Sequence, residues 1–178
     1  MDARSESEST PTKNRTTAER KSERELVVTR TVNGPARFVF EAWTRAELFK
    51  QWWVPKSLGL TLVSCEVDAR VGGGYRLVFR HGDSEPMAFF GRYLEVIPHS
   101  RLVWTNEEAG DRGPVTTLTL EEKGGKTLLV VHELYPSKEV LDAAMATGES
   151  MILDSHGKSG MGETFEQLDA LLIALGPG

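Results

Sequence analysis

The chain lacks most of the features that assign a protein to a compartment or a partner. Its single cysteine, Cys65, excludes a disulfide within the chain and fits a reducing, cytoplasmic setting. No apolar run approaches membrane-spanning length, and the N-terminus lacks the apolar core of a secretory signal. The net charge of −5 disfavours a nucleic-acid surface, which is usually basic. We therefore expect a cytoplasmic protein that neither inserts into a membrane nor binds nucleic acid.

Motifs for metals, cofactors and nucleophilic catalysis are missing as well. The sequence contains no HExxH, CxxC, phosphate-binding loop or GxSxG pattern. The three glycines at 72–74 lie between two predicted strands, so they indicate a tight hairpin rather than a phosphate-binding turn before a helix. We expect no bound metal and no cofactor.

The first 24 residues differ in composition from the rest of the chain. They include no Leu, Ile, Val, Phe, Tyr or Trp, so they cannot bury enough apolar surface to offset the entropy of ordering. We expect residues 1–24 to form a disordered tail. Residues 25–176 have the ordinary composition of a soluble domain, and their number suits one hydrophobic core.

Hydrophobic alternation and turn residues predict seven strands. The first covers residues 26–32 and is followed by two short helices over 36–44 and 45–53, the second with Thr44 as its cap. The other six strands are expected at 60–68, 74–81, 86–97, 101–107, 115–123 and 127–135. Because the breaks between them are short, the strands should form an antiparallel meander.

The end of the chain predicts helices. A helix over 138–146 begins after Ser137, and residues 148–160 have no regular pattern. In the final helix, spacings of four and three residues place five apolar side chains on one face: Met161, Phe165, Leu168, Leu172 and Leu175. Asp169 is expected away from this face. The sequence thus predicts an α+β fold, in which a seven-stranded curved antiparallel sheet wraps around the long C-terminal helix.

Several short segments have characteristic sequences. Besides Arg30 and Pro35 they are VFEAWT at 39–44, WWVP at 52–55, EVDARVGG at 66–73, GRYLEVIP at 91–98, RLVWT at 101–105 and Gly160-Met161. Together these segments resemble the helix-grip proteins of the START and birch-pollen-allergen superfamily, also called SRPBCC. Within it the chain is similar to the activator of Hsp90 ATPase homologue 1-like family of bacteria.

The resemblance implies a cavity between the C-terminal helix and the sheet. Relatives include lipid carriers, binders of hormones and flavonoids, polyketide cyclases, and a co-chaperone domain that stimulates Hsp90. Strand alternation already places Tyr75, Leu77 and Phe79 on one face. With the resemblance, we expect the ligand-binding residues to be Tyr75, Leu77, Phe79, Phe90, Tyr93, Trp104, His132, Met151, Met161 and Phe165. The alternative is that these side chains fill the core and leave no cavity.

Two pairs of residues are the best acid–base candidates. His132 with Glu133 lies on the last strand, where His132 alternates with Val131, so that one of these two faces the interior. Asp154 and His156 form a weak metal or dyad pattern, because only two ligands are visible. Neither pair carries a catalytic motif, and an enzyme is not the favoured interpretation.

Three functions remain open. The favoured one is binding of a small apolar or amphipathic molecule without catalysis. A polyketide cyclase-like enzyme would use the same cavity and needs two converging polar groups within it. A protein–protein regulator would instead use an outer face, with a chaperone partner suggested by family analogy alone. A homodimer is compatible with all three.

Overall fold

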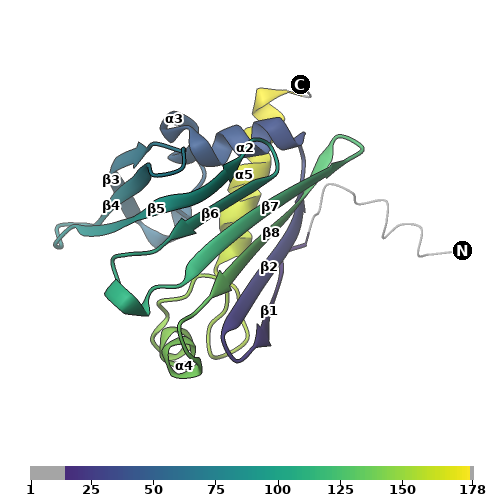
Figure 1. Ribbon diagram of the computed structural model, residues 1–178. Coiled ribbons are helices and arrows are strands. Elements are labelled where there is room, and N and C mark those ends of the chain that lie inside the picture. The colour runs from purple at the N-terminus through teal and green to yellow at the C-terminus, as the bar shows by residue number, and fades with distance from the viewer. Residues whose placement is uncertain (1–14, 177–178) are drawn as a thin grey trace, which may run out of the picture.

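A computed structural model describes residues 15–176 of the chain, and it contains one strongly curved antiparallel sheet (Figure 1). The eight strands lie in the order β1-β2-β8-β7-β6-β5-β4-β3. Their bounds are β1 Thr17–Ser22, β2 Glu25–Val32, β3 Leu60–Val67, β4 Gly74–His81, β5 Met87–Ile97, β6 Arg101–Thr105, β7 Val115–Lys123 and β8 Lys126–Leu134. The antiparallel meander runs from β3 to β8, as predicted from the sequence. Strand β8 then pairs with β2, and β2 pairs with β1.

The pairing of β2 with β8 joins the N-terminal strands to the last strand of the meander. Val28 lies opposite Val131, and both are buried. Along β2 every second residue is buried, so one face of this strand belongs to the core. The N-terminal strands, the meander and the C-terminal helix therefore belong to one unit, and the predicted α+β, helix-grip fold is confirmed.

The eighth strand, β1, corrects the predicted N-terminal tail. Residues 17–22 pair antiparallel with β2, with Ala18 opposite Val28, and Arg20 forms an ion pair with Asp142 at 2.7 Å. The prediction of disorder was wrong for this segment because an edge strand is held by backbone hydrogen bonds, which do not require large apolar side chains. Residues 1–14 of the predicted tail lie outside the described residues.

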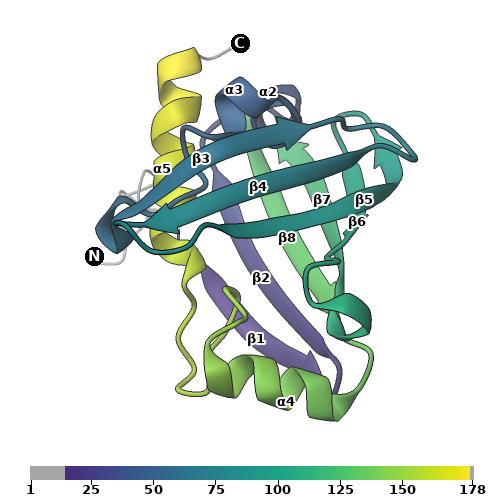
Figure 2. The same ribbon diagram turned by 90° about the vertical axis from the view of Figure 1, so that its left-hand side faces the viewer.

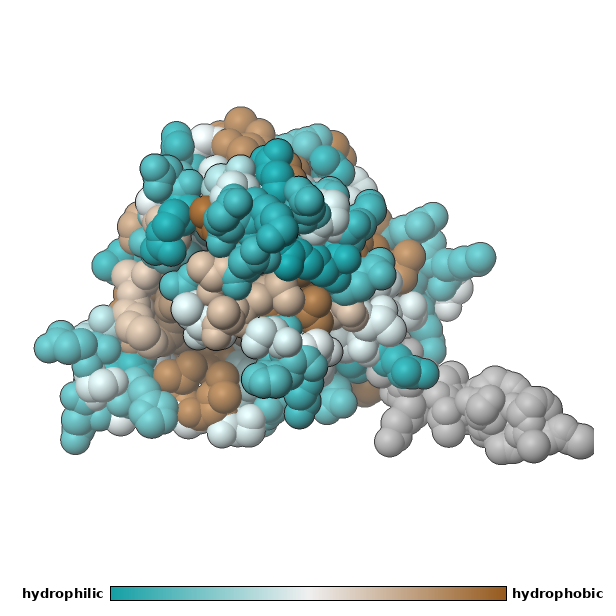
Figure 3. Space-filling view, turned by 90° about the horizontal axis from the view of Figure 1, so that it is seen from below, coloured by the Kyte–Doolittle hydropathy of each residue, from teal (hydrophilic) through white to brown (hydrophobic). Residues whose placement is uncertain are grey.

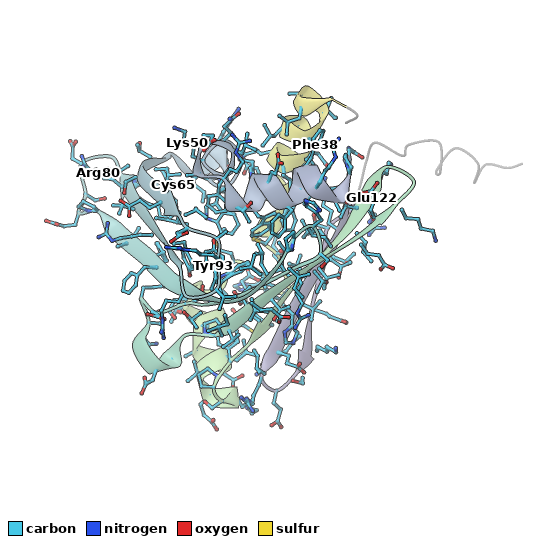
Figure 4. The ribbon with its side chains drawn as sticks, turned by 45° about the horizontal axis from the view of Figure 1, so that its top comes forward. Phe38, Lys50, Cys65, Arg80, Tyr93 and Glu122 are labelled. Atoms are coloured by element: carbon cyan, nitrogen blue, oxygen red, sulfur yellow. The ribbon has the colours of Figure 1, made fainter. Side chains whose placement is uncertain are left out.

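Two short helices form a corner after β2. Helix α2 (Ala36–Thr44) follows Pro35, and Glu122 of β7 accepts a hydrogen bond from the first helical amide, Ala36 N, at 2.9 Å (Figure 4). Helix α3 covers only Ala46–Phe49, shorter than the predicted 45–53. The chain leaves the helix early because Trp52 is fully buried, where its indole Nε1 donates to Ala42 O at 3.0 Å.

The expected cap on α3 is also different. Thr44 does not cap the helix, because its hydroxyl donates back to Phe40 O at 2.8 Å. Arg45 is the residue at the cap position, without a side-chain hydrogen bond to the helix. A short 3-10 helix, η1 (Lys56–Leu58), then leads into β3.

The C-terminal helix α5 (Met161–Leu175) packs against β2 and α2. Met161, Phe165, Leu168 and Leu172 are buried as the spacing predicts, while Leu175 at the end is exposed. Asp169 is buried as well, contrary to the expectation from the helical pattern. It is satisfied there by a cation on β2, which a pattern within the helix does not reveal.

Helix α4 (Lys138–Thr147) lies at the opposite end of the molecule from α2 and α3 (Figure 2). Ser137 caps it as predicted, with its hydroxyl oxygen accepting from Val140 N at 3.2 Å. Another 3-10 helix, η2 (Gly110–Arg112), connects β6 to β7. Among residues 15–176, no helix has the length and apolar character needed to cross a lipid bilayer.

Candidate functional site

A cavity of about 550 Å³ lies over the concave face of the sheet. Its walls come from strands β3 to β8, from the corner formed by α2, α3 and η1, and from α4 with the loop that follows it. Helix α5 contributes Met161 alone to the lining. The cavity is therefore displaced from the expected position between α5 and the sheet, because Phe165, Leu168 and Leu172 pack tightly and fill that space.

Aromatic side chains make up much of the cavity wall. All three tyrosines of the chain and three of its four tryptophans line it. Trp43 is central, with ring centroids 5.6 Å from Trp53 and 5.7 Å from Trp104. Tyr93 lies 6.4 Å from Trp104 in an edge-to-face arrangement and projects from β5 into the interior (Figure 4). These mutual contacts hold the rings in place, so the wall is preformed.

Strand register aligns four of the lining residues across the sheet. Tyr93 on β5 pairs with Trp104 on β6. Trp104 pairs with Thr116 on β7, which in turn pairs with Glu133 on β8. Because directly paired residues point to the same face, this row runs along the cavity floor from aromatic rings to a hydroxyl and a carboxylate.

The carboxylate of Glu133 sits at the polar end of this row. Its Oε1 accepts a hydrogen bond from the hydroxyl of Tyr135 at 2.8 Å. Burial away from bulk water raises the pKa of Glu133 to about 7; the Tyr135 hydrogen bond opposes this rise, and the negative charge of Glu108 adds to it. Burial likewise raises the pKa of Tyr135, helped by the neighbouring Glu133. The chain thus keeps a carboxyl group inside the cavity that changes charge near neutral pH.

A second polar group, built around Tyr75, joins β4 to the β6–β7 connection. The Tyr75 hydroxyl donates toward Thr105 O at 2.9 Å and lies 3.1 Å from Asn106 Oδ1. Asn106 Nδ2 in turn donates to Pro114 O and to Thr116 Oγ1, both at 2.8 Å. Burial raises the pKa of Tyr75, so its hydroxyl stays protonated. This group holds the cavity wall together, and its donors are already engaged.

The opening of the cavity has an apolar side and a polar side. Leu58, Met87 and Phe89 line the cavity and are also exposed, by 50%, 48% and 37% respectively. The exposed polar residues of the lining are Glu108, Arg112 and Glu149. Figure 3, which views the molecule from the end that carries α4, shows hydrophobic residues exposed among hydrophilic ones on this face. An apolar molecule can approach the cavity along such a rim.

Seven of the ten expected ligand-binding residues line the cavity: Tyr75, Leu77, Phe79, Tyr93, Trp104, Met151 and Met161. Phe90 does not, because strand alternation turns it to the outer face and places its neighbour Phe89 inside. Phe165 is fully buried in the core between α5 and the sheet. The expectation for Phe90 was wrong by one residue along the strand. The expectation for Phe165 was wrong because tight packing leaves no cavity beside it.

His132 also lies outside the cavity. Val131 and Glu133 face inward, so His132 points to the opposite face of β8. There its Nε2 lies 2.8 Å from Glu25 Oε2 on β2, and this contact lowers the pKa of Glu25. His132 and Glu133 therefore do not act together, although they are adjacent in sequence.

The Asp154–His156 pair has a local structural role. Asp154 Oδ1 accepts hydrogen bonds from the backbone amides of His156 and Lys158, at 2.8 and 2.9 Å, which shapes the loop before α5. Neither residue lines the cavity. Within the described part of the chain, no three His, Cys, Asp or Glu side chains are grouped as metal ligands would be.

Sequence reasoning missed the contribution of α4 and of the β6–β7 connection. Val140 and Ala144 line the cavity from α4, and Asn106 and Pro114 line it from the connection. A spacing of four residues places Val140 and Ala144 on one helix face, and this pattern could have indicated that the helix contributes to the cavity. The position of Asn106 depends on the curvature of the sheet and has no local signature.

Comparison with known proteins supports the architecture. The sequence model of the family described as "Activator of Hsp90 ATPase homolog 1-like protein" matches residues 33–173. No curated protein sequence matches the chain closely enough to count as a relative.

Solved structures resemble the chain along almost its whole length. A crystal structure of a protein from Rhodobacter sphaeroides has a TM-score of 0.77 at 22% identity and covers 90% of this chain and 99% of that chain. A protein from Nitrosomonas europaea has a TM-score of 0.71 at 25% identity, with coverages of 86% and 96%. One from Chromobacterium violaceum has a TM-score of 0.64 at 28% identity, with 83% and 96% covered. The family model spans most of the chain, and the structures share its fold: the chain belongs to the activator of Hsp90 ATPase homolog 1-like family.

Proposed function

We propose that the protein binds a small apolar or amphipathic molecule in the cavity above the sheet. The observation that supports this most directly is the combination of a volume of about 550 Å³ with a mainly aromatic and aliphatic lining. Pockets for small molecules usually measure about 300–1,000 Å³ and present a few polar groups within an apolar surface. Here the Glu133–Tyr135 pair is such a polar group, whereas the Asn106 amide is engaged within the wall.

The driving force for such binding is the removal of apolar surface from water. Each Å² of apolar surface that leaves water contributes about 25 cal/mol. The tryptophan and tyrosine rings are already held by one another, so binding does not require them to lose much side-chain freedom. A preformed wall of this kind favours affinity for a ligand with a flat apolar body.

The test is to fill the cavity with a large side chain and to compare ligand binding with that of a variant carrying the same side chain outside the cavity. Val140 and Ala146 both lie on α4, but Val140 lines the cavity whereas Ala146 is exposed and does not. Val140→Trp should weaken binding of the neutral apolar dye Nile red at least about tenfold. Ala146→Trp should leave it within twofold of the unchanged protein. Equal dye binding by the two variants would contradict the proposal.

Native mass spectrometry supplies a second measurement. Protein purified quickly and sprayed under native conditions should carry additional mass that disappears on unfolding. The additional mass should be lower in amount for Val140→Trp than for Ala146→Trp. A ligand retained equally by both variants would have to sit outside the cavity.

A second candidate function is acid–base catalysis on the bound molecule. It is favoured by one observation, the carboxyl group of Glu133, which faces the cavity and has a pKa of about 7. Glu133→Gln keeps the shape but removes the proton transfer. If the protein is an enzyme, the wild type and Glu133→Gln will carry adducts of different mass after purification from the same cells. Identical adducts would support binding alone.

A further inference from the structure

The charged groups of the cavity lining are unequally distributed. Three carboxylates, Glu108, Glu133 and Glu149, line the cavity, together with one guanidinium, Arg112. Glu108, Glu149 and Arg112 are exposed at the opening. Glu133 lies deeper, on the strand floor beside Thr116. A molecule inside the cavity therefore meets a single ionisable acid, and no lining lysine or histidine stands opposite it.

Glu133 has capacity for another partner. Within residues 15–176, its only hydrogen bond comes from Tyr135 and is made to Oε1. None of the ion pairs among these residues includes Glu133. A carboxylate can accept hydrogen bonds at both oxygens, so Oε2 is available to a ligand that donates. An ionised carboxylate in a mainly apolar cavity gains most from a donor that is itself positively charged.

The aromatic wall adds a second attraction for positive charge. The faces of tryptophan and tyrosine rings carry partial negative charge, and cations within about 6 Å of a ring centroid are attracted to them. Trp104 and Glu133 are separated by one strand, β7, so their backbones are about 10 Å apart. A compact molecule can place a cationic group at Glu133 while its apolar body lies against Trp104.

We propose that the cavity selects molecules in which a protonated amine is joined to an aromatic or other flat apolar body, with the ammonium group on Glu133 and the body against the Trp43, Trp53 and Trp104 rings. This inference rests on the proposed function, because it names the class of ligand for the same cavity. Fatty acids and other carboxylates are disfavoured, since their charge would meet the carboxylate of Glu133. Neutral alcohols can donate to Glu133 but lack the charge.

The titration behaviour of Glu133 agrees with this geometry. Burial raises its pKa to about 7, and the groups that act on it are the Tyr135 hydroxyl and the Glu108 carboxylate. An ammonium group next to Glu133 would offset the desolvation of its ionised form, which is the main cause of the raised pKa. Ligand and carboxylate therefore stabilise each other's charged state.

Three probes with the same ring system separate charge from apolar contact. They are 2-naphthylmethylamine, 2-naphthalenemethanol and 2-naphthoate, which are cationic, neutral and anionic at pH 8. Isothermal titration calorimetry with the full chain at pH 8 should give the amine about tenfold or more higher affinity than the alcohol, a difference that corresponds to about 1.4 kcal/mol. The naphthoate should bind most weakly. An amine that binds no more tightly than the alcohol, or does not bind, overturns the inference.

Two variants that each remove one carboxylate locate the effect. Glu133→Gln should bring the amine-to-alcohol affinity ratio below about threefold and leave the affinity for the alcohol within about threefold. Glu139→Gln removes the same charge from an exposed position on α4 outside the cavity, and it should keep the full ratio. A ratio that survives in Glu133→Gln would place the selectivity elsewhere and overturn the inference. Circular dichroism and alcohol binding show whether Glu133→Gln is folded.

A variant-free measurement covers the case in which Glu133→Gln does not fold. In the wild type, the amine-to-alcohol affinity ratio should decline when the pH falls from 8 to 5.5, and a ratio that stays constant overturns the inference.

The proposed function and the proposed ligand class can be disproved separately. Alcohol binding without preference for the amine overturns the ligand class alone. Nile red binding that is insensitive to Val140→Trp overturns the cavity as binding site, and the ligand class with it.

Discussion

Arg30 and Asp169 form a buried ion pair that joins the first long strand to the last helix. Arg30 Nη2 lies 2.6 Å from Asp169 Oδ2, and the two side chains are only 4% and 9% exposed. Asp169 Oδ1 also accepts a hydrogen bond from Asn33 N at 2.8 Å, where the chain leaves β2. Arg30 Nη1 reaches Thr16 Oγ1 at 2.8 Å, ahead of β1. The pair thus fixes α5 against β2 at the edge of the core.

Replacing Asp169 by Asn should destabilise the protein strongly. The substitution leaves the Arg30 guanidinium buried without a counter-charge, which typically costs about 3–5 kcal/mol. The free energy of unfolding, measured with urea, should fall by this amount. Arg70→Ala breaks an exposed pair with Asp68 and is the control, with little expected change. Similar losses in both variants would contradict the role assigned to Asp169.

The double variant Arg30→Met with Asp169→Leu should recover much of the lost stability. Apolar side chains of similar size avoid the desolvation of two charges and often match or exceed a buried ion pair in stability. The free energy of unfolding of this variant, measured with urea, should lie between the values of Asp169→Asn and the wild type, or above that of the wild type. A double variant that is less stable than Asp169→Asn alone would show that the pair is needed for more than charge balance.

Gly91 on β5 should not accept even a methyl group. A Cβ at this position would overlap the Thr105 carbonyl oxygen and approach Tyr75 Cε2 to 2.9 Å. The Tyr75 ring crosses β5 at this glycine to reach Thr105 on β6. Gly91→Ala should therefore lower the free energy of unfolding by about 3 kcal/mol, at the upper end of overpacking effects, and weaken Nile red binding.

Gly162→Ala is the matched control for the glycine prediction. A Cβ at Gly162 in α5 meets no atom within 4 Å, so alanine should leave stability unchanged or raise it slightly. Thermal unfolding followed by circular dichroism is sufficient to compare the two variants. A Gly91→Ala protein as stable as Gly162→Ala would mean that β5 and β6 can move apart at no cost.

Glu133 should make the unliganded protein less stable as the pH rises through neutrality. Its pKa is raised from 4.5 to about 7 in the folded state. Between these values the folded protein keeps a proton that the unfolded chain has released, so the free energy of unfolding decreases with increasing pH, by up to about 3 kcal/mol. Urea unfolding at pH 5 and pH 8 should show this decrease in the wild type and in Glu139→Gln. The decrease should be absent in Glu133→Gln, and a parallel decrease there would assign it to another group.

The preference for amines should depend on the same titration of Glu133, but it should increase with pH, whereas the stability of the unliganded protein decreases. Above pH 7 the carboxylate of Glu133 is ionised and attracts an ammonium group, whereas below pH 6 it is protonated and neutral. An alkyl ammonium remains protonated over this whole range. The affinity of 2-naphthylmethylamine should therefore increase from pH 5.5 to 8, while that of 2-naphthalenemethanol stays nearly constant. Parallel pH dependence of the two probes would contradict an interaction with Glu133.

Two of the errors in predicting the site residues came from a shift of one residue along a strand. Phe90 and His132 were expected inside, yet their neighbours Phe89 and Glu133 line the cavity. Side chains of a strand alternate, so a shift of one residue exchanges the two faces. Which parity faces inward depends on the pairing partners and on bulges such as that between Tyr93 and Glu95.

The sequence by itself determined the order and type of the strands and α-helices from β2 onward, but not the two short 3-10 helices. Alternation in strands such as β4 and β7 and the three- and four-residue spacing in α5 are local properties, written in adjacent residues. Tertiary structure alone decided that Asp169 is buried against Arg30, that residues 17–22 form an edge strand, and that α4 lines the cavity while α5 contributes only Met161. These outcomes depend on contacts between residues far apart in the chain, whose energies exceed the local preferences that a sequence pattern reports.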